Sequence, residues 1–488
     1  MSLLCPHHGR LKTWFAVWVS LLSAAYPLHA QIGSTLNSST PTKIDRSYKI
    51  LRESEDWSFL RDAALRNDVW DPVKFIPIPV QKPDWYVSLG GEAREVWEQI
   101  GNDNFGTAPF FNHSFLERYM LHADTHFGPH FRTFVQLKSG LEDFRIGGPR
   151  PIDEKRLDFL AAYLELGTAG EEQGRDFVKL RIGRQELNYG SGRLVSVREG
   201  PNVRQSFDGF KVRSKVGSWN LDGWAVRPGL DKPDFFDNAP NHATGFWGAY
   251  ATHPGTKAIS IDPYYLGLDR QAATFNRGSG HEVRHTLAAR VWKPVATKER
   301  GWDFDDEAVW QFGSFGSGGI RAWTIASDTG YSLPDEPLRP RFSMKADISS
   351  GDNPNNKYLG TFNPIFPLGN YFGVLATTGP GPLNFIDVHP RVQTYYPHGV
   401  TVSTDWVLQW RESLLDGVYT VPGNLLRAAG NSRARFVGHR PGMEVKWQVD
   451  RHLWAQADYG IFYSGQFMKQ TQPGKNINCW TLWTGYKF

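Results

Sequence analysis

The chain has 488 residues and a formal net charge of +4 at pH 7, and 40% of its residues are hydrophobic. Its 2 cysteines are too few for a disulfide-stabilised scaffold or a cysteine-based metal site. The small net charge gives no support to nucleic-acid binding.

The first thirty residues, 1–30, predict a secretory signal peptide. Arg10 and Lys12 precede the apolar run Trp14–Ala25, and the small residue Ala30 ends the segment. This order of charged, apolar and small residues is typical of cleaved export signals, and the apolar run is short for a membrane-spanning helix. We expect cleavage after Ala30, which leaves a single cysteine in the mature chain.

Residues 31–83 predict a periplasmic arm or plug segment rather than a domain. A polar stretch, QIGSTLNSSTPTK, comes first, and EDWSFLRDAALRND is compatible with a short helix. The stretch VWDPVKFIPIPVQKP is rich in proline and is expected to be extended.

From residue 84 to residue 488, apolar and charged side chains alternate along successive strand-length segments. In HFRTFVQLKSG, Phe131 and Val135 fall on one face, and Arg132 and Lys138 fall on the other. A soluble sheet with one wet face shows the same alternation. The dense charge on one face and the aromatic residues that end the other, in a chain with 14% aromatic residues, favour a transmembrane barrel.

The expected fold is all-β, a transmembrane antiparallel β-barrel of about 18 strands that occupies residues 84–488. The last segment, CWTLWTGYKF, ends on Phe488 and resembles the carboxy-terminal assembly signal of outer-membrane barrels. Residues 349–382 are rich in Gly, Pro and Asn. Because long loops without secondary structure are usually functional, we expect this stretch to be an outer loop that folds inward over the pore.

Phase along the strands places one set of cationic side chains on the charged face, which faces the water-filled lumen of such a barrel. The set comprises Arg94, Arg132, Lys138, Lys179, Arg181, Lys211, Arg213, Arg290, Lys345 and Arg411. Arg184 is one position out of phase with Arg181 and faces inward only if Gly183 marks a bulge. Acidic residues in the same phase are expected either to pair with these cations or to form an opposing patch: Glu92, Asp124, Asp347, Asp405, Glu444 and Asp450.

Three more arginines, Arg193, Arg198 and Arg204, lie on a connection between two strands and are expected at the pore mouth. The carboxylates close to them in sequence are Glu186, Glu199 and Asp208. These acids leave a second interpretation open, in which the arginines only brace the loop through ion pairs.

The stretch GRQELNYGSGRLVSVREGPNVRQSFDGFKV, residues 183–212, resembles the signature region of the alginate export family of outer-membrane barrels. It joins a G-R-Q-E-L strand end, an R-E-G-P-N-V-R loop and a returning S-F-D-G strand. WDPVKFIPI, WYVSLGGEARE and NFIDVHPR resemble other family positions, so the resemblance covers about residues 50–488. It implies a monomeric barrel whose arginine-lined lumen attracts an anionic polysaccharide.

The residues and the resemblance together predict an outer-membrane channel that passes an anionic, alginate-like polysaccharide or an acidic oligosaccharide. Guanidinium groups stay ionised and bind carboxylates at two points, and rings of arginine or lysine make pores anion-selective. The expected partners are this polymer or an acidic small solute, outer-membrane lipid and periplasmic export proteins.

Two alternatives stay open. One is an uptake porin for small acidic or aromatic solutes. The other is a secreted β-rich carbohydrate-binding protein or a polysaccharide-cleaving enzyme.

No cofactor, metal ion or catalytic residue is expected. His281 and His285 have the spacing of a helical metal pair, but the surrounding VRHTLAARVW alternates as a strand. GSFGSGG lacks the lysine of a phosphate-binding loop, and the sequence contains no G-x-S-x-G nucleophile motif.

Overall fold

The computed structural model describes residues 44–78, 82, 84–108, 111–171, 174–255, 259–295, 298–369 and 379–488. The predicted signal peptide and the first part of the predicted arm, up to residue 43, lie outside the described residues. Ser47–Phe488 form one compact unit.

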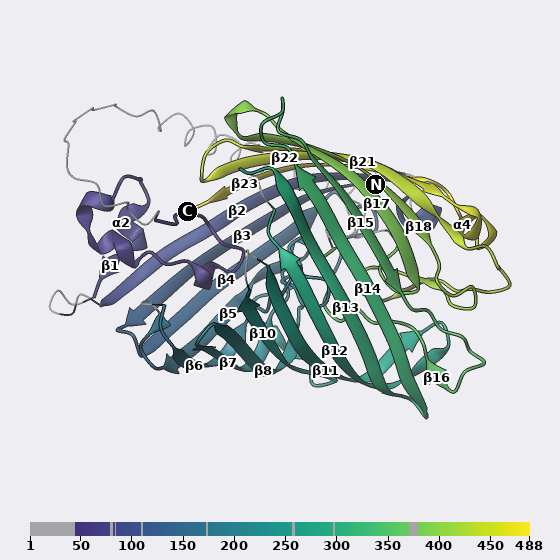
Figure 1. Cartoon of the computed structure of the whole chain (residues 1–488), viewed down its shortest axis with the longest axis horizontal. Coiled ribbons are helices and arrows are strands. Elements are labelled where there is room, and N and C mark those ends of the chain that lie inside the picture. Colours follow the sequence, from purple (N-terminus) through teal and green to yellow (C-terminus); the bar gives the residue numbers. More distant parts are fainter. Residues whose placement is uncertain are drawn as a thin grey trace, which may run out of the picture. The chain divides into compact units, whose positions relative to one another are not determined.

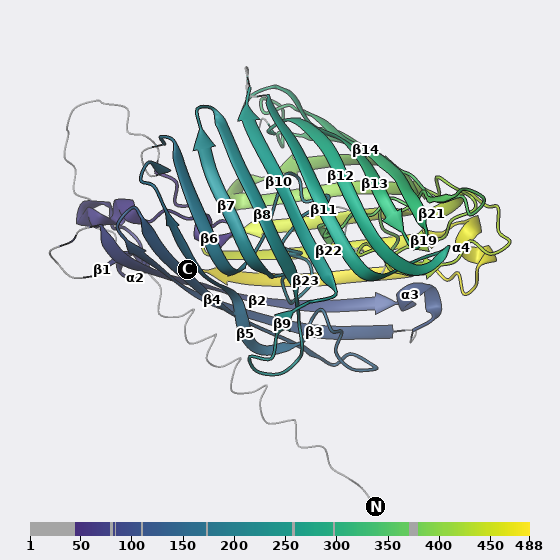
Figure 2. The ribbon, with the colours of Figure 1, turned by 90° about the horizontal axis from the view of Figure 1, so that it is seen from below.

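Eighteen long antiparallel strands form a closed barrel, in which the last strand pairs back onto the first (Figures 1 and 2). They are β2 (Trp85–Gly101), β3 (Phe111–Phe127), β4 (Phe131–Asp143), β5 (Lys155–Gly167), β6 (Phe177–Gln185), β7 (Phe207–Val216), β8 (Trp219–Leu230), β10 (Thr244–Pro254), β11 (Ser260–Phe275), β12 (Gly278–Lys293), β13 (Gly301–Phe315), β14 (Gly318–Ser332), β15 (Arg341–Ser349), β17 (Phe385–Tyr395), β18 (Val400–Trp410), β21 (Phe436–Gln448), β22 (Leu453–Ser464) and β23 (Ile477–Lys487). Closure pairs the first strand with the last, so the described strands of the barrel wall leave no open sheet edge. The predicted fold class and strand number are confirmed.

The remaining elements are short. The strands are β1 (Ile76–Pro77), β9 (Ala239–Pro240), β16 (Tyr358–Leu359), β19 (Val418–Tyr419) and β20 (Leu425–Arg427). The helices are η1 (Arg52–Ser54), η2 (Ser58–Arg61), η3 (Ala63–Leu65), α2 (Asp71–Lys74), α3 (Asp103–Gly106), η7 (Pro397–Gly399) and α4 (Gln466–Gln470). In the described ranges, none of the helices has the length and apolar character needed to cross a membrane.

Side chains alternate between the inside of the barrel and its outer surface. On β14, Ile325 is 55% exposed, whereas its neighbours Thr324 and Ala326 are buried. The outward side chains are mostly large and apolar, and examples from other strands are Leu121, Leu164, Val178, Phe210, Leu287, Trp310, Phe342, Trp406, Met443 and Leu482. An apolar outer surface around a charged interior is the arrangement of a barrel immersed in lipid.

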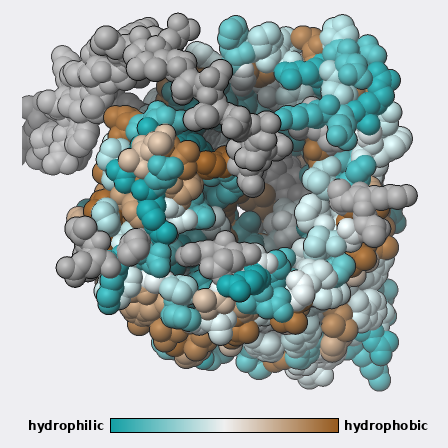
Figure 3. All heavy atoms as spheres, turned by 60° about the vertical axis from the view of Figure 1, so that its left-hand side comes forward, coloured by the Kyte–Doolittle hydropathy of each residue, from teal (hydrophilic) through white to brown (hydrophobic). Residues whose placement is uncertain are grey.

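The two ends of the barrel differ. Short connections such as residues 128–130, 217–218 and 396–399 join strands at the end that carries the C-terminus, which we call the turn end. Longer connections, including residues 186–206 and 350–384, join strands at the opposite end, the loop end. Figure 3 looks toward the turn end, which is hollowed and has hydrophilic residues around the hollow and hydrophobic ones on the flank.

Two long connections fold into the barrel from the loop end, and we call residues 186–206 the first inner loop and residues 350–384 the second. They pair with each other, since the amide of Ser196 donates to the carbonyl of Phe366 at 2.9 Å. The second loop also reaches the wall, where the Gln311 side chain donates to the Asn363 carbonyl at 2.7 Å. The predicted inward fold of residues 349–382 therefore holds for the described part of that stretch, and residues 370–378 lie outside it.

An apolar cluster fills the space between the inner loops and the wall formed by β8 to β14. Leu194 and Phe366 of the loops pack there with Trp224, Phe246 and Leu266 of the strands. Because the loops occupy this side, the inside of the barrel is partly filled.

The segment Ser47–Ile78 packs against the turn end. Trp57, Leu60 and Phe75 form a small apolar cluster with Tyr86 of β2. The carboxylate of Asp68 accepts from the imidazole of His452, in the turn between β21 and β22, at 2.8 Å. This segment is therefore fixed to the barrel through both apolar and polar contacts.

Phe488 lies where the barrel closes. Its backbone exchanges two hydrogen bonds with Gly91 of β2, at 2.9 and 3.0 Å. Its ring stacks on Trp70, with the ring centroids 4.3 Å apart. The assembly role of Phe488 stays a prediction, and the structure gives the residue a closing position.

Candidate solute pathway in the lumen

One wall of the lumen, formed by β2 to β7, carries a dense set of cations. The cationic side chains that the structure buries on this wall include Arg94, Arg118, Arg132, Lys138, Arg181 and Lys211. Lys179 and Arg213 are partly exposed, with side chains 14% and 24% accessible. Period-2 alternation explains their common direction, because residues two apart on a strand point to the same face.

Arg118 of β3 was not among the predicted lumen residues. It contacts Glu92 of β2 at 2.5 Å and also pairs with Glu199 of the first inner loop. Its neighbour Glu117 is charged as well but bonds the hydroxyl of Tyr119. Because Glu117 and Arg118 are adjacent charges, the sequence does not show which of them faces the lumen. The apolar residues Leu116 and Met120, which are buried in the same phase as Arg118, also break the alternation of apolar and charged faces.

The first inner loop is bound to the cationic wall by carboxylates. Glu199 of the loop pairs with Arg118 and lies 3.6 Å from Arg94, both on the wall, and within the loop Arg204 makes a two-point contact with Glu186 at 2.8 and 3.0 Å. Burial alone would raise the pKa of Glu199, but the guanidinium groups of Arg118 and Arg204 outweigh burial and hold that pKa below its ordinary value. This carboxylate therefore stays ionised and braces the loop.

Arg132 and Arg181 are at the centre of a second network nearer the turn end. Arg132 contacts Asp124 at 2.7 Å, and Arg181 contacts Glu165 at 2.9 Å. The guanidinium of Arg181 also lies over the ring of Tyr163, with its carbon 3.9 Å from the ring centroid. Such packing holds the guanidinium plane in one orientation.

Most of the other predicted cations also lie close to carboxylates. The pairs are Lys138 with Asp231 at 2.6 Å, Lys179 with Glu171 at 2.5 Å, Lys211 with Asp222 at 3.0 Å, Arg213 with Glu171 at 2.6 Å, Arg290 with Asp305 at 2.6 Å, Arg193 with Glu307 at 3.1 Å and Lys345 with Asp328 at 3.8 Å. A buried charge without a partner is costly, so this pairing keeps the cations ionised inside the barrel.

A stripe of carboxylates lines another part of the wall, on β17 to β22. Asp387, Asp405, Glu444 and Asp458 belong to it, and the cation Arg391 lies 3.5 Å from Glu444. The acids that the sequence placed in the lumen phase thus divide into two groups. Glu92 and Asp124 pair within the cationic wall, whereas Asp347, Asp405 and Glu444 lie on the β15 to β21 side.

Asp450 is not a lumen residue. It lies in the turn between β21 and β22, where its carboxylate accepts from the amides of His452 and Leu453 at 2.7 and 2.8 Å. The alternation predicted for this segment ends before the turn, because an Asp that accepts from amides two and three residues ahead stabilises a turn.

Arg411 was predicted on a strand but lies just beyond the end of β18. Its guanidinium donates to four backbone carbonyls of the connection that follows, those of Leu414, Asp416, Ser432 and Ala434. It also lies over the ring of Phe467 at 3.9 Å. With its donors occupied, Arg411 organises the loop end and presents no free guanidinium to the lumen.

Arg184 does not turn inward through a bulge. The pairing of β6 with β7 runs through Gly183 and Gly209 without a register shift, although both glycines have positive φ. Arg184 stays out of phase with Arg181 and makes a two-point contact with Asp208, its partner across the strands, at 2.8 and 3.1 Å.

Arg198, on the first inner loop, differs from the other loop arginines. Its backbone has φ +55°, and its guanidinium carbon lies 5.6 Å from the ring centroid of Phe366. No carboxylate lies within ion-pair distance of it in the described parts of the chain. Burial lowers the pKa of Arg198 from its ordinary value, yet the group stays a cation at neutral pH.

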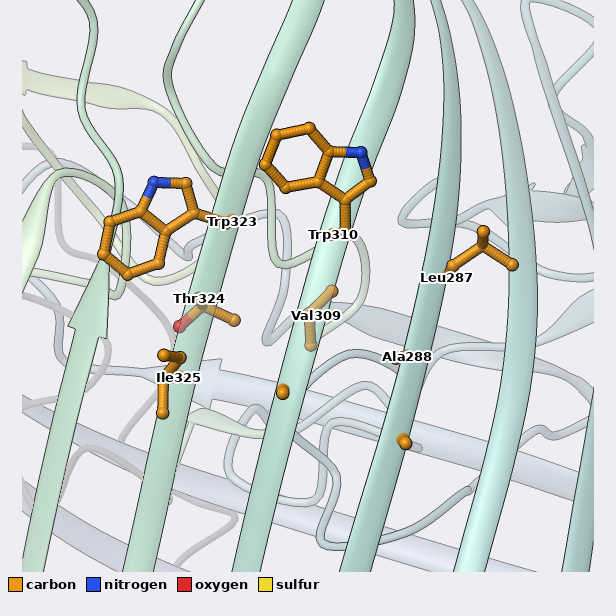
Figure 4. Close-up of a pocket in the computed structure, with 9 residues that line it drawn as sticks. Leu287, Ala288, Val309, Trp310, Trp323, Thr324 and Ile325 are labelled. Atoms are coloured by element: carbon orange, nitrogen blue, oxygen red, sulfur yellow. The ribbon is translucent and has the colours of Figure 1, made fainter.

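An apolar groove also lies on the outside of the barrel, between β12, β13 and β14 (Figure 4). Leu287, Trp310 and Ile325 are among the residues that line it. Because these side chains point toward lipid, the groove is not part of a pathway through the lumen. Among the described residues, no group of three or more His, Cys, Asp or Glu side chains is arranged to hold a metal ion.

The sequence pattern of the family described as "Alginate export" matches residues 85–481, which include almost the whole barrel. The chain belongs to the alginate export family. It is therefore an outer-membrane barrel, and the turn end faces the periplasm, because short turns of such barrels do so. No curated protein matches the chain significantly.

Solved structures with the same fold are outer-membrane channels. OccAB3 of Acinetobacter baumannii is 10% identical, with a TM-score of 0.59 over 82% of this chain and 99% of that chain. OccD3 (OpdP) of Pseudomonas aeruginosa is 12% identical, with a TM-score of 0.57 over 82% of this chain and 91% of that chain. OccK2 (OpdF) of Pseudomonas aeruginosa, solved in complex with glucuronate, is 11% identical, with a TM-score of 0.55 over 82% of this chain and 98% of that chain.

Proposed function

We propose that this outer-membrane channel passes carboxylated sugars, namely uronates and short acidic oligosaccharides, without catalysing a reaction. The observation that carries the proposal is Arg198, a cation without a carboxylate partner in the described structure, on a loop that folds into the lumen beside the cationic wall. A guanidinium in that place attracts carboxylates and binds them at two points. OccK2 (OpdF), which shares the fold, was solved with glucuronate, a uronate of this class.

The ion pairs of the cationic wall fit weak, repeated contacts rather than one tight site. A solute carboxylate can displace a protein carboxylate from one guanidinium and then move to the next guanidinium. One such series is Arg94, Arg118 and Arg204. A channel needs such a series, because a solute that binds too tightly does not leave.

Reversal-potential measurements on the purified channel in planar bilayers test the proposal. We expect anion selectivity, and we expect glucuronate to reduce the chloride current at concentrations at which glucose does not. Cation selectivity, or equal effects of glucuronate and glucose, would contradict it.

Passage of a long anionic polysaccharide is the second candidate, and the family match favours it. A series of oligouronates of increasing length separates the two. Polymer passage predicts that long oligomers produce long current blocks that end in translocation, whereas the channel for small acids predicts that only short oligomers enter.

A further inference from the structure

Residues Ile50–Glu55 enter the lumen from the turn end, and three wall or loop arginines bind them there. The Arg132 guanidinium donates to the backbone carbonyl of Glu53 at 2.6 Å, and Arg204 donates to that of Ile50 at 2.9 Å. Nη1 of Arg181 lies 3.0 Å from Oε1 of Glu53. The chain thus places one of its own carboxylates on the cationic wall.

The groups around the Glu53 side chain form a preorganised binding site for a carboxylate. Its side chain is 6% accessible, and that of Arg181 is 2% accessible, so the contact is shielded from water. Glu165 contacts the same guanidinium through Nε and Nη2, at 3.0 and 2.9 Å, and leaves Nη1 directed at Glu53. Tyr163 supports the guanidinium plane at 3.9 Å. These contacts fix the donor before any ligand arrives.

Among the ion pairs of this network, the cations of the barrel outnumber its carboxylates by one. The linked cations are Arg132, Lys179, Arg181 and Arg213, and the linked carboxylates of the barrel are Asp124, Glu165 and Glu171. Glu53 supplies the fourth negative charge. If the segment withdraws, one buried cation is left without compensation, which is costly unless another carboxylate takes the place.

The segment is attached by contacts that are separate from this carboxylate. Arg52 pairs with Glu55 at 2.6 Å and donates to the carbonyls of Gly91 and Phe488 at 2.9 and 2.8 Å. Because these contacts remain when Glu53 is changed, its carboxylate can be tested without undocking the whole segment.

We propose that Glu53 occupies a binding subsite for the carboxylate of the transported sugar acid, formed by Arg181 and Arg132, so that residues 50–55 act as a competing internal plug. The proposal rests on the proposed function for its substrate class. A sugar acid that enters the site displaces Glu53, and the cation count of the network stays balanced throughout. With an internal competitor, the apparent dissociation constant equals the intrinsic one divided by the fraction of sites that the competitor leaves free.

Glu53→Gln tests the subsite, and Asp56→Asn is the matched control. Asp56 is three residues away and exposed, and its replacement also removes one negative charge from the segment. We expect Glu53→Gln to raise the open probability in potassium chloride and to lower the glucuronate inhibition constant at least tenfold, whereas Asp56→Asn leaves both unchanged. Glu53→Asp, which keeps the charge but shortens the reach, is expected to fall between wild type and Glu53→Gln. Adding Arg181→Gln to Glu53→Gln should abolish the gain in glucuronate affinity.

Heat-modifiable migration on a gel confirms that each variant is a folded barrel before it is recorded. An unchanged glucuronate inhibition constant in Glu53→Gln, in a channel that is still anion-selective, overturns the subsite and leaves the proposed function standing. If neither wild type nor Glu53→Gln is anion-selective, the proposed function is overturned instead.

Discussion

Nη1 of Arg193 lies 3.1 Å from Oε2 of Glu307, and this contact ties the first inner loop to β13 on the far side of the lumen. The other oxygen of Glu307 accepts from the Tyr264 hydroxyl at 2.6 Å. The loop is thus held from two sides, by its Glu199, which pairs with Arg118 and Arg94 of the cationic wall, and by its Arg193, which pairs with Glu307 of β13.

Arg193→Ala should enlarge the passage and make the current noisier. The change leaves Glu307 buried without its cation, which costs about 3–5 kcal/mol for a buried pair, and the loop can relieve this cost by moving. Single-channel recordings should show a higher conductance with more frequent transitions. Arg300→Ala is the control, because Arg300 pairs only with exposed Glu336 and Asp335 among the described residues, and such pairs contribute little. Equal conductance in wild type and Arg193→Ala would show that this contact does not set the width of the passage.

Arg198→Ala should weaken glucuronate inhibition of the chloride current about tenfold. A hydrogen bond to a charged group contributes about 1.5–3 kcal/mol, and 1.4 kcal/mol corresponds to a factor of ten. Arg198→Lys keeps the charge but loses the planar fork, so its inhibition constant should lie between those of wild type and alanine. If Arg198→Ala binds glucuronate as wild type does, Arg198 is not a contact for the solute.

Ile325→Arg should destabilise the barrel by about 2–4 kcal/mol, because the side chain lies on the outer surface of β14 and would carry a charge into the hydrocarbon region. Urea titration of folding into lipid vesicles measures the change. Val295→Arg is the matched control, since Val295 is similarly exposed, at 45%, but lies in the connection between β12 and β13 at the turn end. A similar loss in both variants would mean that the site of Ile325 is not in the hydrocarbon.

Docking of the segment Ser47–Ile78 should strengthen as the pH rises from about 7 toward 10. Burial, aided by the charge of Arg52, lowers the pKa of Lys74 from 10.5 to about 7. Between these two values the docked lysine is neutral and the undocked one is protonated, so docking releases a proton and higher pH favours it.

The comparison of wild type with Lys74→Met isolates this effect. Proteinase K cleavage within residues 61–69 reports undocking, and at each pH both proteins meet the same protease activity. The cleavage rate of wild type relative to Lys74→Met should fall as the pH rises through this window. A ratio that does not change with pH would exclude Lys74 as the titrating group.

Much of the barrel follows from local sequence. Alternation along a strand needs only neighbouring residues, which is why Arg132, Arg181 and Arg290 are placed in the lumen phase by sequence and by structure alike. The position of Arg411 depends instead on where β18 ends. Its guanidinium is held there by carbonyls 3 to 23 residues further along the chain, which local alternation does not include. The contact of Glu53 with Arg181 joins residues 128 positions apart, so no pattern among neighbouring residues predicts it.

Deletion of Phe488 should slow assembly of the barrel and leave the pore of the assembled fraction unchanged. The deletion removes two backbone hydrogen bonds to Gly91 at the closing seam and a ring that stacks on Trp70, whereas the lumen contacts are elsewhere. Heat-modifiable migration as a function of time after dilution from urea measures assembly, and single-channel conductance measures the pore.

Trp70→Ala removes the same stacking contact but keeps the terminal residue and its backbone pairing. If this variant assembles as slowly as the deletion, the stacking contact explains the effect. If it assembles normally, the terminal residue itself is required, as an assembly signal would be. Normal assembly of the deletion variant would contradict both interpretations.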